Sequence, residues 1–315
     1  MKILKNKIVK FFLKLFVSLA FVAWLIFKID WQEVLFYISK ISFWNILIYV
    51  AVLLFGMAIS AYKWKILAKF KGFDISLKKS FQLYLAGAFI NNLMPSFIGG
   101  DTYKAYQLGK KDKKYVSAAA SVFVDRITGL IGAMILSVIF AALNWQMVAE
   151  HKILLIILVI IFLILFAMVI IGASAKFSFW QKLLQFMPKK IVEIIIDFAE
   201  YGNNKNTLFK SFLLAIAYNL IGLAVVNYIL FWGLGIQVGI LNYLTVIFLV
   251  SIVSALPVSV NNIGIKEWAY ITFFGFFGIA SSGVVAVAII SRVIQMVVSF
   301  AAVPYYLKNK NQGNK

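Results

Sequence analysis

Long apolar runs separated by short polar segments organise the chain. The uninterrupted runs lie at residues 11–29, 43–62, 115–143, 153–172, 211–232 and 284–306. A helix needs about 20 apolar residues to cross a hydrocarbon core of roughly 30 Å, so each run predicts one full span. The pattern therefore predicts an all-α polytopic membrane protein with about six full spans, in which residues 1–315 form a single integral membrane domain.

Two further apolar stretches are broken in the middle by proline, glycine and asparagine. The first reads NNLMPSFIGGD and ends at Asp101, and the second reads PVSVNNIGIKE and ends at Glu267. Irregular backbone at membrane depth is tolerated only against protein or a water-filled cavity. We therefore expect each stretch to form a re-entrant hairpin or a pair of half-spans.

The distribution of lysine predicts the topology. Residues 1–14, 63–79, 104–114, 176–210 and 308–315 hold 25 of the 31 basic groups. The positive-inside rule places these segments and both termini in the cytoplasm. Because 63–79 and 104–114 are then on one side, the broken stretch between them must enter and leave the membrane from that side.

The order of spans and breaks predicts two units of opposite orientation, residues 43–143 and 211–306. Asp101 precedes Arg126 by 25 residues, and Glu267 precedes Arg292 by 25 residues. Paired broken segments in corresponding halves are typical of transporters with inverted-topology repeats, whose binding site lies at the breaks. The sequence thus predicts an inverted repeat.

Composition narrows the functional classes. The chain is 63% hydrophobic and 13% charged, has a mean hydropathy of +0.95 and contains no cysteine. It leaves no room for a separate soluble catalytic domain and carries no recognised catalytic motif, so an enzyme is the less favoured class. We expect no cofactor and no bound metal. The net charge of +20 indicates contact with anionic lipids and not with nucleic acid. Residues 176–206 predict an amphipathic cytoplasmic segment.

Ionisable residues inside the apolar runs are the candidates for a site. Each costs about 2.5–3.5 kcal/mol on insertion scales, so such residues are rarely without a role. Arginine suits a phosphate group because its planar fork donates two parallel hydrogen bonds. Arg126 and Arg292 are therefore expected to flank a central cavity and hold an anionic group. Alternatively, they form internal salt bridges with Asp101, Asp125 or Glu267, and both roles can coexist.

Both breaks offer further polar groups. Gly99 and Gly100 precede a helix start, where exposed backbone N–H groups favour an anion. An alternative is that Asp101 simply caps that helix. The candidate substrate-binding residues are Asn91, Asn92, Gly99, Gly100, Asp101, Asp125, Arg126, Asn261, Asn262, Lys266, Glu267 and Arg292. Three cations among them balance three acids, which predicts that anion transport depends on pH.

The segments NNLMPSFIGGDTYKAYQL, SVFVDRITGL and LPVSVNNIGIKEWAY resemble the membrane region of the lysylphosphatidylglycerol synthase/flippase family, also called flippase-like or UPF0104 proteins. The third segment departs from the family pattern, because Asn261 and Asn262 stand where glycines are usual. The resemblance implies a multi-helix domain that moves or houses a modified lipid. It also implies that the acids and arginines at the two breaks are functional.

We therefore expect a translocator of an anionic phospholipid or polyprenyl-phosphate-linked lipid in a bacterial cytoplasmic membrane. One alternative is a lipid-modifying enzyme, or its membrane subunit, that transfers an aminoacyl or glycosyl group to a lipid. A second alternative is a secondary transporter of a small anion. Anionic lipids are the expected partners, and a homo-oligomer or a separate lipid-modifying enzyme is possible as well.

Overall fold

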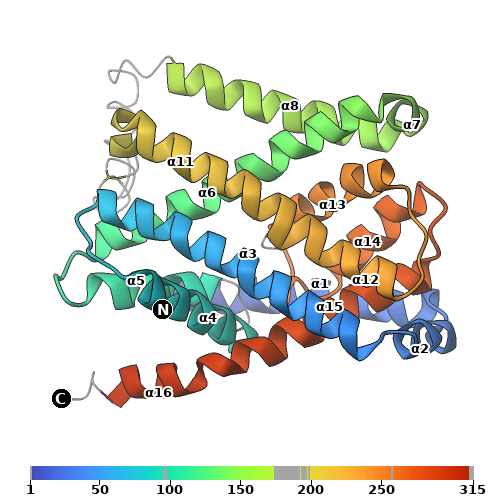
Figure 1. Cartoon of the computed structure of the whole chain (residues 1–315), viewed down its shortest axis with the longest axis horizontal. Coiled ribbons are helices and arrows are strands. Elements are labelled where there is room, and N and C mark those ends of the chain that lie inside the picture. The colour runs from blue at the N-terminus through green and yellow to red at the C-terminus, as the bar shows by residue number, and fades with distance from the viewer. Residues whose placement is uncertain are drawn as a thin grey trace.

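The computed structural model describes residues 2–94, 98–173, 192, 197, 199–256 and 258–311. Regular structure in these ranges is helical (Figure 1). The elements are α1 (Lys2–Lys28), α2 (Trp31–Ser39), α3 (Phe43–Phe70), α4 (Leu77–Leu93), α5 (Ile98–Gly109), α6 (Tyr115–Leu143), α7 (Trp145–Glu150), α8 (Lys152–Ala173), η1 (Glu200–Asn203), α11 (Lys205–Ala217), the π-helix η2 (Tyr218–Val225), α12 (Val226–Gly233), α13 (Ile240–Ser254), η3 (Val260–Asn262), α14 (Ile265–Gly275), α15 (Ser281–Ser299), η4 (Phe300–Ala302) and α16 (Val303–Asn311).

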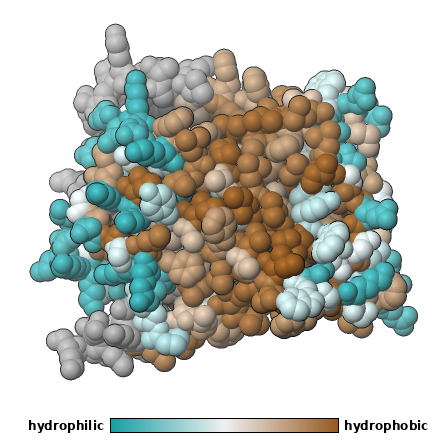
Figure 2. Space-filling model, in the orientation of Figure 1, coloured by the Kyte–Doolittle hydropathy of each residue, from teal (hydrophilic) through white to brown (hydrophobic). Residues whose placement is uncertain are grey.

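A hydrophobic band crosses the middle of the molecule, and hydrophilic residues gather at its left and right ends (Figure 2). Four helical stretches in the described residues are long and apolar enough to cross a membrane. They are Phe43–Phe70, Tyr115–Leu143, Lys205–Gly233 and Ser281–Leu307. These stretches overlap four of the predicted spans and confirm a membrane protein with several apolar helices.

The predicted count of about six spans is not reproduced among the described residues. Helices Phe12–Lys28 and Trp31–Ser39 form a pair bent by 86°, which raises the number of spans to five if the pair counts as one. Helix α8 carries the predicted span 153–172 but contributes only a shorter apolar helix, Lys152–Met168. The proposed inverted repeat stays a prediction.

Each broken stretch separates two short helices that pack against each other. Helices α4 and α5 flank the first break, and α13 and α14 flank the second. In Figure 1, the first pair lies toward the left end of the molecule and the second pair toward the right. We call these pairs the first and second hairpins. Pro95 and Pro257, at the two breaks, lie outside the described residues.

Two glycines bring the helices of the first hairpin into backbone contact. A Cβ atom on Gly100 would lie 2.1 Å from the carbonyl oxygen of Gly87, so a larger residue does not fit. The Gly100 N–H also donates a hydrogen bond of 2.7 Å to the Asn91 side chain. The paired glycines therefore serve close helix packing in this structure, and the Gly100 N–H already has an acceptor.

Replacing Gly100 with alanine is expected to lower the free energy of unfolding by about 1–3 kcal/mol, the usual cost of overpacking. Thermal unfolding of the purified protein in detergent measures the change. Gly202→Ala is the matched control, because a Cβ there meets no atom within 4 Å. Equal melting temperatures for the two variants would contradict the close approach of α4 and α5.

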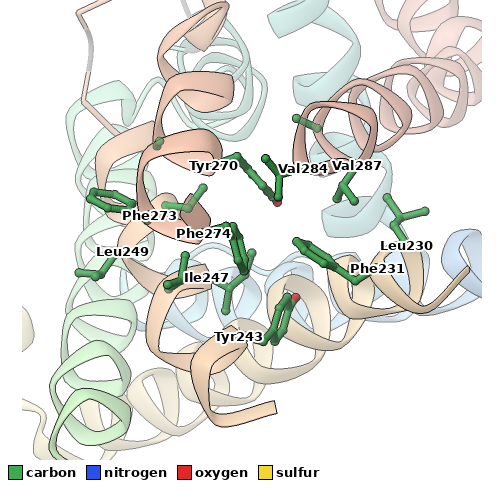
Figure 3. Close-up of a cluster of buried hydrophobic side chains, with 14 of the residues drawn as sticks. Leu230, Phe231, Tyr243, Ile247, Leu249, Tyr270, Phe273, Phe274, Val284 and Val287 are labelled. Carbon is green, nitrogen blue, oxygen red and sulfur yellow. The ribbon is translucent and has the colours of Figure 1, made fainter. Parts of the chain in front are cut away.

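Figure 3 shows the buried cluster that holds the second hairpin against the spans. Phe231 from α12 and Phe274 from α14 have ring centroids 4.8 Å apart. Tyr243 from α13 packs on the Phe231 ring and donates a hydrogen bond of 2.6 Å to the Ala224 carbonyl oxygen. Val284 of α15 completes the cluster. These contacts fix the second hairpin relative to α12 and α15.

The predicted amphipathic segment 176–206 lies largely outside the described residues. Its described end packs against the last turns of α3. Lys71 Nζ lies 2.6 Å from Glu200 Oε2 and 3.4 Å from Asp197 Oδ1. Tyr201 is buried and donates a hydrogen bond of 2.9 Å to the Leu67 carbonyl oxygen. This end of the segment is thus attached to α3 by ion pairs and one hydrogen bond.

The predicted orientation can be tested with single cysteines, because the chain has none of its own. Asp74→Cys and Lys111→Cys introduce exposed thiols before and after the first hairpin. Both thiols are expected to resist an impermeant thiol reagent in intact cells and to react after lysis, because lysine-rich segments stay in the cytoplasm. Labelling of only one thiol in intact cells would contradict a hairpin that enters and leaves from one side.

Candidate functional site

Arg126 and Asp101 form the centre of the first polar cluster. Arg126 Nε and Nη2 donate to the two Asp101 oxygens at 2.7 and 3.1 Å, a bidentate ion pair between α6 and the first turn of α5. The predicted spacing of 25 residues therefore corresponds to a direct contact. The Arg126 side chain is nevertheless 54% exposed. Its third nitrogen, Nη1, has no hydrogen-bond partner in the described part of the chain.

Asp125 faces a different set of partners, as expected for a neighbour pointing about 100° away on the same helix. Its carboxylate is 3% exposed and lies 3.1 Å from Lys63 Nζ. Tyr84 donates a hydrogen bond to the same carboxylate. Lys104 Nζ lies 3.9 Å from Asp125 and 3.0 Å from Asp101, so it bridges the two acids. Three cations and two acids thus form one connected network.

Lys63 and Lys104 were missed by the sequence reasoning, which assigned them to cytoplasmic loops. Helix α3 continues to Phe70, eight residues beyond the predicted end of that span, and α5 includes Lys104. Both lysines are buried. The available signal was the segment AYKWKILAKF, which has no helix-breaking residue before Gly72 and so extends the helix past Lys63.

Glu267 and Arg292 form the second cluster, at the start of α14. Arg292 Nη2 lies 2.9 Å from Glu267 Oε1, and the other Glu267 oxygen accepts a hydrogen bond of 2.8 Å from the Gly264 N–H. Arg292 also donates to the carbonyl oxygens of Asn261 and Asn262, at 3.1 and 3.2 Å. Arg292 therefore supplies donors to backbone carbonyls that the break leaves outside a regular helix.

The backbone of the second break explains its unusual residues. Asn261 and Asn262 have φ values of 47° and 57°, in the left-handed region that glycine favours and asparagine tolerates. Gly264 has φ 87°, and a Cβ there would lie 2.3 Å from Phe21 Cβ. Asparagines can thus occupy positions where the resembling family usually has glycines, whereas Gly264 cannot be replaced so easily.

Helix α1 holds the second break from the side. Ser18 accepts a hydrogen bond of 2.7 Å from the Val260 N–H, and the rings of Phe21 and Trp268 are 6.2 Å apart. Neither Ser18 nor Phe21 was among the predicted site residues, because nothing in the sequence links α1 to a segment 242 residues later.

The remaining predicted residues connect helices around the clusters. Asn92 donates a hydrogen bond of 2.8 Å to Ser299, which links α4 to α15. A Cβ on Gly99 would lie 2.9 Å from the Met94 side chain. Lys266 donates a hydrogen bond of 2.9 Å to Ser291. The predicted residues therefore gather at the two hairpins.

The charge of the two clusters differs from the balance that the sequence predicted. The first contains Lys63, Lys104 and Arg126 against two acids. The second contains Lys266 and Arg292 against Glu267. Each cluster thus carries one excess positive formal charge. The correction comes from the two buried lysines, which the sequence had assigned to loops.

Comparison with known proteins places this architecture in a family. Residues 11–302 match the family model described as lysylphosphatidylglycerol synthase TM region. A UPF0104 membrane protein of Methanothermobacter thermautotrophicus is 24% identical over 278 residues, which cover 79% of this chain and 82% of the relative. The UPF0104 membrane protein MJ1595 of Methanocaldococcus jannaschii is 26% identical and covers 93% of both chains.

A second Methanocaldococcus jannaschii relative, the UPF0104 membrane protein MJ1078, is 28% identical over 231 residues, which cover 71% of this chain and 95% of the relative. No solved structure matches the chain. The family match covers all the spans described above and both hairpins. The chain therefore belongs to the lysylphosphatidylglycerol synthase TM region family of membrane proteins.

Proposed function

We propose that this protein translocates a lipid with a phosphate-bearing, negatively charged headgroup across the cytoplasmic membrane. The observation that carries the proposal is the excess positive charge of both polar clusters in a chain of apolar spans. Arg126 lies 11 residues after the start of α6, which is about 17 Å along a helix and near the middle of a hydrocarbon core. An unneutralised charge at that depth is costly, and an anionic headgroup would neutralise it.

The arrangement of the hairpins supports movement rather than static binding. The first hairpin extends from one end of the molecule and the second from the other (Figure 1). Broken helices that meet around a central site are the usual elements of alternating access. A headgroup that leaves one cluster for the other would remain beside arginine and lysine donors.

The revised charge count changes the expected pH dependence. A balanced core would require an acid to be protonated before an anion could bind. Because each cluster already has one excess cation, anion binding does not require that step. We therefore no longer expect transport to depend on an acidic pH.

Reconstitution in liposomes tests the proposal directly. A fluorescent phosphatidylglycerol in the inner leaflet is expected to become accessible to a membrane-impermeant quencher faster with protein than in protein-free vesicles. Uptake of inorganic phosphate is measured in the same vesicles. Phosphate uptake without movement of any anionic lipid would replace the lipid proposal with transport of a small anion.

A further inference from the structure

The two cations of the second cluster differ in what they already bind. Both terminal nitrogens of Arg292 are engaged, with the Asn261 and Asn262 carbonyl oxygens and with Glu267. Both Glu267 oxygens are engaged as well, by Arg292 and by the Gly264 N–H. Arg292 and Glu267 together therefore complete the hydrogen bonds of the second break.

Lys266 has no such carboxylate partner. Within the described residues, no acid lies within 4.0 Å of Lys266 Nζ, and its hydrogen-bond partner is the Ser291 hydroxyl at 2.9 Å. Ser291 in turn donates to the Ala288 carbonyl oxygen at 2.9 Å, so its oxygen is oriented as an acceptor for Lys266. An ammonium group has three donors, and two remain after the bond to Ser291.

The position of Lys266 adds to this excess of donors. It lies in the first turn of α14, where the helix dipole is positive and a lysine is unfavourable. Arg292, another cation, is bound to the next residue, Glu267. An anion beside Lys266 would offset both effects, since it would pair with the ammonium and face the positive end of the helix.

We infer that Lys266, positioned by Ser291, binds a phosphate oxygen of the translocated lipid, whereas Arg292 is a positioning residue that holds the second break. This inference rests on the proposed function and names the ligand-binding group of the second hairpin. It also separates the two arginines. Arg126 keeps an exposed guanidinium with a free nitrogen, whereas Arg292 is occupied by the break.

The test measures retained lipid and thermal stability on the same variants. Native mass spectrometry counts phosphatidylglycerol bound to the full-length protein released from mixed micelles, with and without inorganic phosphate. Lys266→Gln is expected to weaken lipid binding by about tenfold or more, the loss typical of a charged hydrogen bond, at an unchanged melting temperature. Arg292→Lys is expected to lower the melting temperature, because an ammonium cannot reproduce the fork that reaches Glu267 and both carbonyl oxygens.

Lys111→Gln is the matched control, since it removes a positive charge from an exposed loop position. Wild-type lipid binding by Lys266→Gln would overturn the inference. A melting temperature as low as that of Arg292→Lys would also overturn it, because Lys266 would then be structural. Lys266-dependent binding of inorganic phosphate by a protein that retains no lipid would support the anion site and overturn lipid translocation. A wild-type protein that binds neither ligand would overturn both.

Discussion

Asp125→Ala is expected to lower the free energy of unfolding by about 3–5 kcal/mol, the cost of leaving buried charge without its partner. The variant removes the carboxylate that neutralises Lys63 and contacts Lys104. It also removes the acceptor of the Tyr84 hydroxyl. Lys63 would keep its bond of 2.7 Å to the backbone carbonyl oxygen of residue 125, which cannot neutralise its charge. Thermal or denaturant unfolding in detergent measures the loss.

Two comparisons show that the loss comes from buried charge. Glu200→Ala removes a carboxylate that also pairs with a lysine but is 53% exposed, so its expected cost is below about 1 kcal/mol. The double variant Lys63→Met/Asp125→Leu replaces the pair with apolar side chains and is expected to recover most of the stability. An Asp125→Ala protein as stable as Glu200→Ala would show that the network does not hold α3 to α6.

Arg126→Ala is expected to reduce lipid translocation by about 10- to 100-fold, the range for loss of one charged hydrogen bond, while the protein stays folded. The fold tolerates the change because Asp101 keeps Lys104 at 3.0 Å. Activity falls because the exposed guanidinium of Arg126 is the group in the first cluster that remains open to a ligand. The fluorescent-lipid assay in liposomes measures the rate.

Arg126→Lys keeps the charge but not the fork and is expected to be intermediate, because an ammonium binds phosphate as a point charge. Lys111→Ala serves as the control for a loss of one positive charge outside the clusters. A well-folded Arg126→Ala protein with wild-type transport would remove Arg126 from the site. A variant that fails to fold would instead assign Arg126 to the structural ion pairs.

Much of the helical architecture follows from hydropathy alone. Runs 43–62, 115–143, 211–232 and 284–306 overlap helices long enough to span a membrane, because lipid requires every backbone polar group to be paired within a helix. The breaks after residues 94 and 256 follow from proline and glycine. The acid–arginine spacing of 25 residues likewise corresponds to two real ion pairs. These features depend on local sequence and on the chemistry of the bilayer.

The sequence by itself thus determined that the chain is a helical membrane protein with two broken hairpins and two acid–arginine pairs. Only the tertiary structure decided which lysines join the clusters. Lys63 and Lys104 resemble loop lysines in the sequence, and their burial depends on Asp101, Asp125 and the Tyr84 ring, which other helices supply. The same is true of α1 at the second break. A buried charge is stable only where distant segments provide its partners, and those distances exist only in the folded protein.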